Sequence, residues 1–256
     1  VRDPLLKRAD RMWPGSWDWD NSLADCDGAP STGIGVDGNC PGDSSLPFPH
    51  RRVGESFRAA LGKAGVVVDG ADRIELGQKS LSTDSVVSIH SSLPIDSLLE
   101  QALAKSSNHD IETMGLLAGA SDSVSSRLGG ARSVEARLRW IGLDTARVHL
   151  DDLCGLSRKD AIAARDMARL LSKIARDPEM NVFPLLPEPG KGTLKVRFQK
   201  TLPVGARLRA KTGSLDGVST LVGLLVPPGG DSLVFALFFQ GHVGASTPIR
   251  FAQEQI

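Results

Sequence analysis

The chain has 256 residues, which at roughly 100–200 residues per domain is one large domain, or one domain with a smaller piece attached. Hydrophobic residues make up 41% and charged residues 23%, so the chain can bury a core and lacks the composition of a disordered protein. Its 30 basic and 30 acidic side chains give a formal net charge of zero. This balance removes the usual electrostatic argument for nucleic acid or an anionic membrane as a partner.

The N-terminal region is loop-like. The chain does not start with methionine and no signal-peptide pattern follows Val1, so we expect it to begin inside a longer product. Residues 1–50 are rich in Gly, Pro, Asp and Ser. Cys26 and Cys40 lie in this stretch, and the sequence leaves two readings open. They form a disulfide worth about 3 kcal/mol in an oxidising compartment, or they remain unpaired thiols.

The middle of the chain has the apolar spacing of amphipathic helices. We predict helices over residues 53–64, 94–105, 109–118, 134–141 and 164–175. Ser133 is the expected N-cap of the fourth helix, and residues 66–68 read as a short strand.

The last third is dominated by β-type sequence. Three runs, at 206–212, 217–226 and 232–240, are separated by short, turn-rich linkers, which favours an antiparallel meander. A C-terminal helix is expected to begin at Thr247-Pro248. Helices first and antiparallel strands last predict an α+β fold.

Two motifs carry the chemistry. In Lys211-Thr212-Gly213-Ser214 an ammonium and two hydroxyls stand together where they can bind a carboxylate, and Gly213 lets a substrate backbone come close. Ser106-Ser107-Asn108 matches an S-x-N pattern between two predicted helices, where a helix cap is the plain alternative. S-x-N and K-T-G are two of the three motifs of the penicillin-recognising serine enzymes.

The segments around these motifs extend the match. They are Trp13–Trp17, Ser92–Ile95, Asp152–Arg158, Phe183–Pro187, Gly190–Leu194, Arg197–Phe198 and Arg209–Ser219. In this order they resemble the D-alanyl-D-alanine carboxypeptidase/endopeptidase family, the class C low-molecular-mass penicillin-binding proteins. The resemblance covers about residues 10–245 and is dense from residue 90 onward.

The resemblance implies a β-lactamase/transpeptidase-like fold, with an antiparallel sheet flanked by helices. Residues 1–75 would end an inserted accessory domain, and residues 76–256 would be the C-terminal part of the penicillin-binding peptidase domain. The implied reaction is acyl transfer from peptidoglycan stem peptides outside the cytoplasmic membrane, with β-lactams as inhibitors. No cofactor, metal or nucleic acid is expected.

The family's residue roles map onto matching positions. Ser106, aided by Lys211, would relay a proton to the leaving amine. Asn108 would hold the amide side chain of the substrate. The terminal carboxylate would be bound by Lys211, Thr212, Gly213 and Ser214. The stretch from Lys191 to Lys211 holds seven basic residues and no acidic one, which fits an anionic substrate end or, equally, a solvated basic surface.

Departures from the family pattern leave a second reading open. No serine in this chain has a lysine three residues later, so the nucleophile motif S-x-x-K is expected in a segment upstream of Val1. Leu153 and Cys154 stand where the family usually has Gly and Ser, and a packing role is expected for Cys154. The five histidines show no metal or triad spacing. The alternative function is a catalytically inactive, peptidase-like binding or scaffold subunit.

Overall fold

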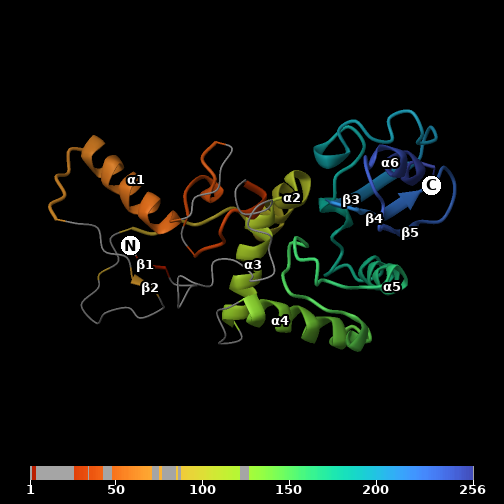
Figure 1. Cartoon of the computed structure of the whole chain (residues 1–256), viewed down its shortest axis with the longest axis horizontal. Helices are drawn as coiled ribbons and strands as arrows, with labels where there is room; N and C mark the ends of the chain where they lie inside the picture. The colour runs from red at the N-terminus through yellow and green to blue at the C-terminus, as the bar shows by residue number, and fades with distance from the viewer. Residues whose placement is uncertain are drawn as a thin grey trace. The chain divides into compact units, whose positions relative to one another are not determined.

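The computed structural model describes residues 2–3, 26–33, 35–42, 48–70, 75–76, 85, 88–121 and 127–255. The chain divides into two compact units (Figure 1). The first contains residues 1–92, 108–136 and 150–160, and the second contains residues 93–107, 137–149 and 161–256.

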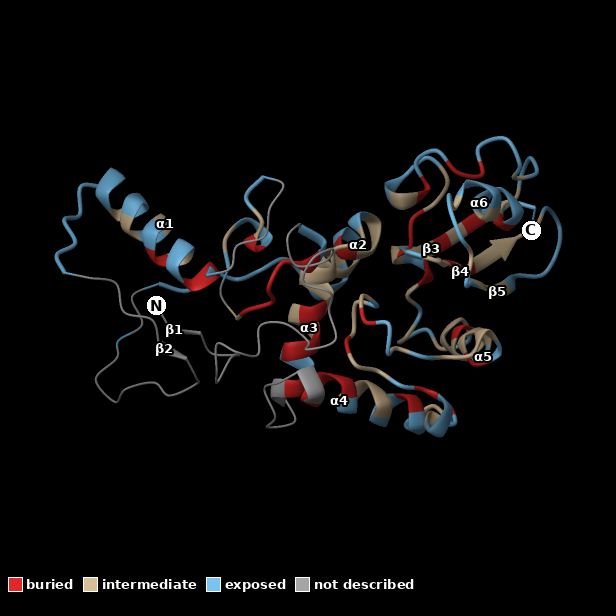
Figure 2. Cartoon of the chain, viewed as in Figure 1, coloured by how far each residue is buried: buried red, intermediate tan, exposed pale blue. Residues whose placement is uncertain are grey.

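The second unit is built on a three-stranded antiparallel sheet in the order β3-β4-β5. Its strands are β3 (Arg207–Leu215), β4 (Val218–Val226) and β5 (Leu233–Gln240). In the register of the sheet, Lys211 lies opposite Val222 and Ser214 opposite Ser219. The burial pattern of β4 alternates along its first half, because successive side chains point to opposite faces (Figure 2).

Helices cover both faces of this sheet. On one face, α5 (Ala164–Ile174) packs Leu171 beside Phe183 and Leu186, against Val222 and Leu224 of β4. On the other face, the core consists of Leu194, Phe198, Leu208, Ala210 and Leu221. There α6 (Thr247–Gln253) contacts β4, and α2 (Ile95–Lys105) joins the α5 side through Leu103. The predicted α+β class with helices flanking an antiparallel sheet is confirmed.

The first unit is mainly helical. It contains α1 (Pro49–Lys63), α3 (Asn108–Ser121) and residues 127–136 of α4 (Arg127–Trp140). Two short strands, β1 (Arg2–Asp3) and β2 (Glu75–Leu76), pair in parallel. Cys26 and Cys40 form a disulfide with Cα atoms 5.4 Å apart, which confirms the bonded reading.

Several predicted elements differ from the structure in extent. Residues 66–68 are not a strand. Val67 is 86% exposed, and the Val68 carbonyl accepts a hydrogen bond from the guanidinium of Arg58 and not from a neighbouring strand. Ser133 lies inside α4 and does not cap it, because the helix begins at Arg127. Strand β3 continues to Leu215, so the K-T-G segment lies within the strand and the turn is confined to Asp216-Gly217.

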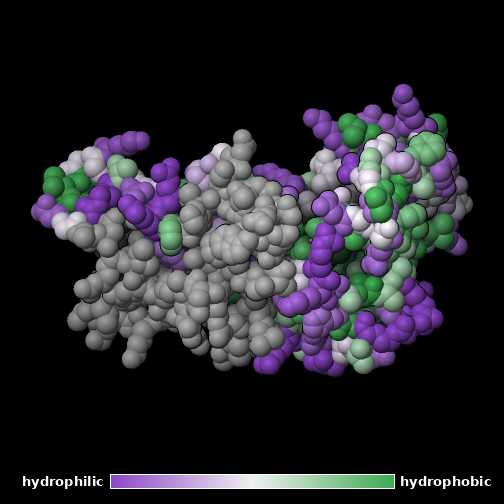
Figure 3. All heavy atoms as spheres, in the orientation of Figure 1, coloured by the Kyte–Doolittle hydropathy of each residue, from purple (hydrophilic) through white to green (hydrophobic). Residues whose placement is uncertain are grey.

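The surface of the described residues mixes polar and apolar side chains. On the face shown in Figure 3, hydrophobic residues are interspersed with hydrophilic ones. Among the described residues, no helix combines the length and the hydrophobicity that a bilayer-spanning helix requires.

Candidate active site

Lys211 lies in the middle of β3, and the fold brings Ser106 to it. The Lys211 ammonium donates hydrogen bonds to Ser106 Oγ at 2.8 Å and to the Thr212 carbonyl at 2.7 Å. Ser106 follows α2 directly, and 105 residues separate the pair in sequence. Ser106 of the S-x-N motif and Lys211 of the K-T-G motif therefore lie together in the second unit.

The backbone of Ser106 is in the left-handed region, with φ 57° and ψ 47°. Its N–H and that of Ser107 both donate to the Ala102 carbonyl, which closes the C-terminus of α2 in the manner of a Schellman motif. Glycine is the residue that normally takes this position, since an L side chain there is strained. The serine here is therefore less favourable for the backbone than glycine would be, and its hydroxyl lies beside Lys211.

Burial sets the ionisation of Lys211. Removal from water disfavours the ammonium form and lowers the pKa of Lys211 to about 8. A lysine with a pKa near neutrality can both donate and accept a proton, whereas an ordinary surface lysine stays protonated. The Ser106–Lys211 pair thus combines a direct hydrogen bond with a lysine of lowered pKa.

The rest of the K-T-G-S segment lies along the same strand. Ser214 is exposed, and Thr212 and Gly213 are partly buried. A Cβ on Gly213 would collide with the hydroxyl of Thr220, its cross-strand partner. A larger residue at this position would therefore force the Thr220 hydroxyl to move.

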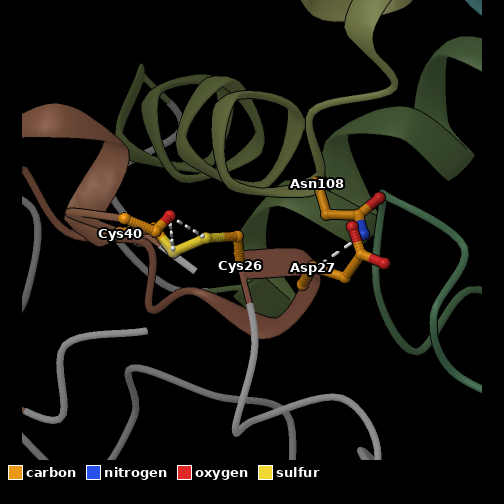
Figure 4. Close-up of a disulfide and its surroundings, with 5 residues drawn as sticks. Cys26, Asp27, Cys40 and Asn108 are labelled. Carbon is orange, nitrogen blue, oxygen red and sulfur yellow. Dashed lines mark hydrogen bonds between the residues drawn. A yellow bond between two sulfur atoms is a disulfide. The ribbon is translucent and has the colours of Figure 1, made fainter. Parts of the chain in front are cut away.

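Asn108 is the first residue of α3 and belongs to the first unit. Its Nδ2 donates to the Asp27 backbone carbonyl at 3.0 Å, next to the Cys26–Cys40 disulfide (Figure 4). It stands two residues after Ser106 in the chain.

The basic run between Lys191 and Lys211 divides into paired and unpaired residues. Arg197 binds Glu254 at 2.8 Å, and Glu188 binds Lys191 at 2.5 Å and Arg209 at 3.5 Å. These contacts lower the pKa of Glu188, mainly through its hydrogen bond with Lys191. Two carboxylates, Glu188 and Glu254, therefore neutralise two of the seven positive charges in this run.

Arg197 is the centre of a buried polar network that the sequence alone did not reveal. Its guanidinium also donates to Gln253 Oε1 at 3.0 Å and to the Arg250 carbonyl at 3.2 Å. Gln253, fully buried, continues the chain of hydrogen bonds to Ser219, which lies opposite Ser214. The network ties α6 to the strand beside the K-T-G-S segment.

Cys154 lies in a loop organised by buried carboxylates. Glu112 accepts the backbone N–H groups of Leu153 and Cys154, and Asp152 accepts those of Gly155 and Ser157. Burial, with the nearby charges of Asp152 and Glu112, raises the pKa of the Cys154 thiol far above its ordinary value. A protonated thiol is a poor nucleophile, so the packing role expected for Cys154 is the better supported one.

Ligand atoms of Glu112, Asp152 and Cys154 lie within 4.8 Å of one another, a spacing that a metal ion could use. The backbone N–H groups that the two carboxylates accept account for their arrangement without an ion. The side chain of Leu153 occupies the space beside Gly115 of α3 and Gly130 of α4. The lack of a Cβ at these two glycines leaves room for the Leu153 side chain.

A separate cavity of about 560 Å³ adjoins the first residues of β3. Its walls come from the segment 181–189, the loop at 202–206 and the beginning of β3, with Leu224 and Val226 of β4. None of the K-T-G-S residues lines it, so the cavity and the Ser106–Lys211 pair are different places in the second unit.

Comparison with known proteins places the chain in a family. The model of the D-Ala-D-Ala carboxypeptidase 3 (S13) family matches residues 44–254. The chain belongs to this family. The family predicted from the ordered motifs is therefore confirmed.

Two curated relatives show the extent of the similarity. The chain is 29% identical over 230 residues to the D-alanyl-D-alanine carboxypeptidase of Actinomadura sp. (strain R39), covering 82% of this chain and 42% of that protein. It is 30% identical over 242 residues to carboxypeptidase DacB of Mycolicibacterium smegmatis, covering 88% and 50%. The chain thus spans about half the length of these relatives.

A solved structure supports the fold of this S13 chain. Penicillin-binding protein 4 from Haemophilus influenzae superposes with a TM-score of 0.74 at 23% identity, covering 87% of this chain and 54% of that one. The β-lactamase/transpeptidase-like architecture predicted from the sequence agrees with this match.

Proposed function

We propose that this chain is the part of a serine-type D-Ala-D-Ala carboxypeptidase that binds the substrate's terminal carboxylate and relays the proton. The hydrogen bond between Ser106 and Lys211 is the observation that carries the proposal. A scaffold has no chemical need for a buried lysine paired with a strained serine. Curated relatives named as D-alanyl-D-alanine carboxypeptidases give the substrate class.

In the proposed reaction a serine attacks the carbonyl carbon of the penultimate D-Ala, and the bond from that carbon to the terminal D-Ala nitrogen breaks. The attacking serine gives its hydroxyl proton to the lysine of S-x-x-K, while Ser106 delivers a proton to the leaving amine and recovers one from Lys211. The proton from the attacking serine then restores Lys211, so acylation moves one proton in total from the serine to the amine. Water then hydrolyses the ester to release the shortened peptide and the free serine. A β-lactam follows the same first step, but its leaving group stays tethered and the ester persists.

Substrate recognition uses the exposed end of the same strand. Lys211, Thr212 and Ser214 bind the terminal carboxylate by charge and by hydroxyl hydrogen bonds, while Gly213 allows close approach. Asn108 binds the amide portion of the stem peptide. Cleavage of peptide cross-links, an endopeptidase reaction, uses the same groups, because it breaks an equivalent bond after a D-Ala.

The nucleophile and its lysine come from an S-x-x-K segment upstream of Val1, since no S-x-x-K occurs among residues 1–256. In this proposal residues 1–75 end an inserted accessory domain and residues 76–256 complete the peptidase domain. The protein acts outside the cytoplasmic membrane, where its peptidoglycan substrate lies and where the Cys26–Cys40 disulfide persists.

The test uses a polypeptide extended upstream of Val1 to include the S-x-x-K segment. It is expected to gain the mass of one benzylpenicillin and to release D-Ala from a peptide ending in D-Ala-D-Ala. Lys211→Ala should slow acylation by a factor on the order of 100 or more. Lys200→Ala, an exposed lysine of the same basic run, is the matched control and should leave the rate unchanged.

A second candidate function is a catalytically inactive binding subunit, which the lack of S-x-x-K favours. Binding of a D-Ala-D-Ala peptide by the extended polypeptide, with neither D-Ala release nor a penicillin adduct, would support this alternative. It would rule out the proposed peptidase.

A further inference from the structure

The Cys26–Cys40 disulfide closes a loop that is organised by its own polar contacts. We call the described residues 26–33 and 35–40 the disulfide loop. Asn39 is fully buried, and its Nδ2 donates to the Pro30 carbonyl at 2.8 Å and to Thr32 Oγ1 at 3.0 Å. The loop therefore has a defined interior, although it contains no regular helix or strand longer than a 3₁₀ turn.

A tight left-handed turn directs the Asn39 side chain inward. Asp37, Gly38 and Asn39 have φ angles of 53°, 61° and 57°. Asp and Asn are, after glycine, the residues that enter this region most readily, so the turn needs no unusual compensation. A Cβ on Gly35 would lie 2.7 Å from Asn39 Oδ1, so the loop also closes tightly around this side chain.

The disulfide loop holds the start of α3 at two consecutive residues. The Asp27 carbonyl accepts from Asn108 Nδ2 at 3.0 Å, as Figure 4 shows. Ser31 Oγ, fully buried, donates to the His109 carbonyl at 3.3 Å, and Asn39 Nδ2 lies 3.4 Å from His109 Nε2. Both 3₁₀ turns of the loop contact α3.

The hydrogen bond to the Asp27 carbonyl orients the Asn108 carboxamide, and the two contacts with His109 hold the adjoining backbone. Asp27 O is an acceptor, so only the NH₂ side of the amide can face it. The disulfide loop therefore determines which side of the amide carries Nδ2. The Oδ1 atom and the second N–H then point away from the Asp27 carbonyl. A preoriented amide loses less conformational entropy when it binds a peptide group.

We propose that the disulfide loop is a positioning element for the substrate site: the Asp27 carbonyl, anchored by Cys26–Cys40, orients the carboxamide of Asn108 for the stem peptide. The inference rests on the proposed role of Asn108 in substrate binding. It assigns a function to the accessory segment that the S-x-N motif by itself does not contain.

A double-mutant cycle in the extended polypeptide tests the proposal. The variants are Cys26→Ser with Cys40→Ser, Asn108→Ala, and all three together. Loss of the disulfide should lower the second-order rate of acylation by a D-Ala-D-Ala peptide about tenfold, but should change nothing further once Asn108 is alanine. Rates are measured well below the melting temperature of each variant, and Cys154→Ser is the control with the disulfide intact.

Additive losses would show that the disulfide acts through general stability, and this outcome would overturn the proposal. An unchanged rate in the disulfide variant would overturn it too. If the disulfide variant does not fold, Ser31→Ala is used in its place. It removes only the hydrogen bond to the His109 carbonyl. It should give a smaller loss, which also vanishes in the Asn108→Ala background.

A second readout separates this inference from the proposed function. In residues 1–256 alone, the Asn108 side-chain amide proton that binds the Asp27 carbonyl should exchange slowly with solvent in ¹⁵N–¹H NMR spectra. Cys26→Ser with Cys40→Ser should accelerate that exchange at least tenfold. Exchange that is already fast with the disulfide intact, or that is unaffected by its loss, would overturn the positioning role even in an active enzyme. Slow exchange in a polypeptide that is never acylated would instead reject only the proposed function.

Discussion

Ser106 shows at the scale of one residue how a functional side chain can oppose local preference. The Schellman closure of α2 requires a left-handed residue, and glycine takes that conformation without a Cβ penalty. The serine is kept there with φ 57°, and its hydroxyl accepts from Lys211. A left-handed serine at the end of α2 therefore keeps its hydrogen bond to Lys211 at a cost in backbone conformation.

Comparing Ser106→Gly with Ser106→Ala isolates the conformational cost. Both variants lack the hydroxyl, so both should lose acylation activity by a factor on the order of 100. Only alanine keeps a Cβ in the left-handed region, so Ser106→Gly should be more stable than Ser106→Ala by about 1 kcal/mol. Urea unfolding of the two variants measures the difference, and equal stabilities would show that Ser106 is not strained in solution.

Lys211 predicts a pH dependence of substrate binding. Burial lowers its pKa to about 8, so above that pH the free site is largely neutral. A substrate carboxylate favours the ammonium form and raises the pKa, so binding takes up a proton above pH 8. Affinity for a D-Ala-D-Ala peptide should fall about tenfold per pH unit above pH 8, until the pH reaches the pKa of Lys211 in the complex.

Calorimetric titration of the extended polypeptide between pH 7 and 10 measures this fall, and two buffers of different ionisation enthalpy measure the proton uptake. Lys211→Arg is the control, because a guanidinium stays charged throughout and should give a flat profile. A flat profile with Lys211 itself would mean that its pKa is not depressed.

At the scale of elements, the Arg197 network fixes α6 on the sheet. Glu254 accepts from the Arg197 guanidinium at 2.8 Å and from the Phe198 N–H at 3.4 Å. Phe198 is 3% exposed and has φ 60°, which is rare for a bulky residue. One carboxylate therefore neutralises a buried cation and helps to hold a strained backbone in the core.

We predict that Glu254→Gln destabilises the protein by about 3 kcal/mol, because it leaves the Arg197 charge buried without compensation. Replacing both residues, with Arg197→Met and Glu254→Leu, should cost less than the single change, since no unpaired charge remains. Glu188→Gln, which weakens exposed ion pairs, should change stability by no more than about 0.5 kcal/mol. Chemical denaturation measures all three, and equal effects of Glu254→Gln and Glu188→Gln would contradict the role given to the network.

At the scale of the whole molecule, the proposed proton relay of Ser106 and Lys211 has no recognisable nucleophile to serve within residues 1–256. Acyl transfer needs a serine beside a base, and no serine in residues 1–256 has the S-x-x-K spacing. The thiol of Cys154 does not substitute for it, because its raised pKa keeps it protonated.

We therefore expect residues 1–256 alone to form no covalent penicillin adduct and to release no D-Ala from a D-Ala-D-Ala peptide. Adding the upstream segment should restore an adduct on a serine of that segment. Intact-mass analysis after incubation with benzylpenicillin measures the adduct in both polypeptides. An adduct on the isolated chain would identify one of its own serines as a nucleophile.

The sequence by itself determined the features that depend on local patterns. Apolar spacing predicted helices at the positions of α2, α3 and α5, and alternating β-type runs predicted the meander β3-β4-β5. The ordered motifs identified the family because they preserve residue types at fixed places along the chain. The cysteine pair was recognised, but its bonding was left open because spacing alone does not give the distance between two sulfur atoms.

Only the tertiary structure decided which distant groups meet. The contacts of Arg197 with Glu254, and of Asn108 with the Asp27 carbonyl, join segments more than 50 residues apart, and no local pattern encodes them. The K-T-G segment was expected at a strand end because Gly213 resembles a turn residue, yet cross-strand pairing with Thr220 keeps it in β3. Local propensity sets where elements form, whereas side-chain packing and hydrogen bonding between elements set which residues share a site.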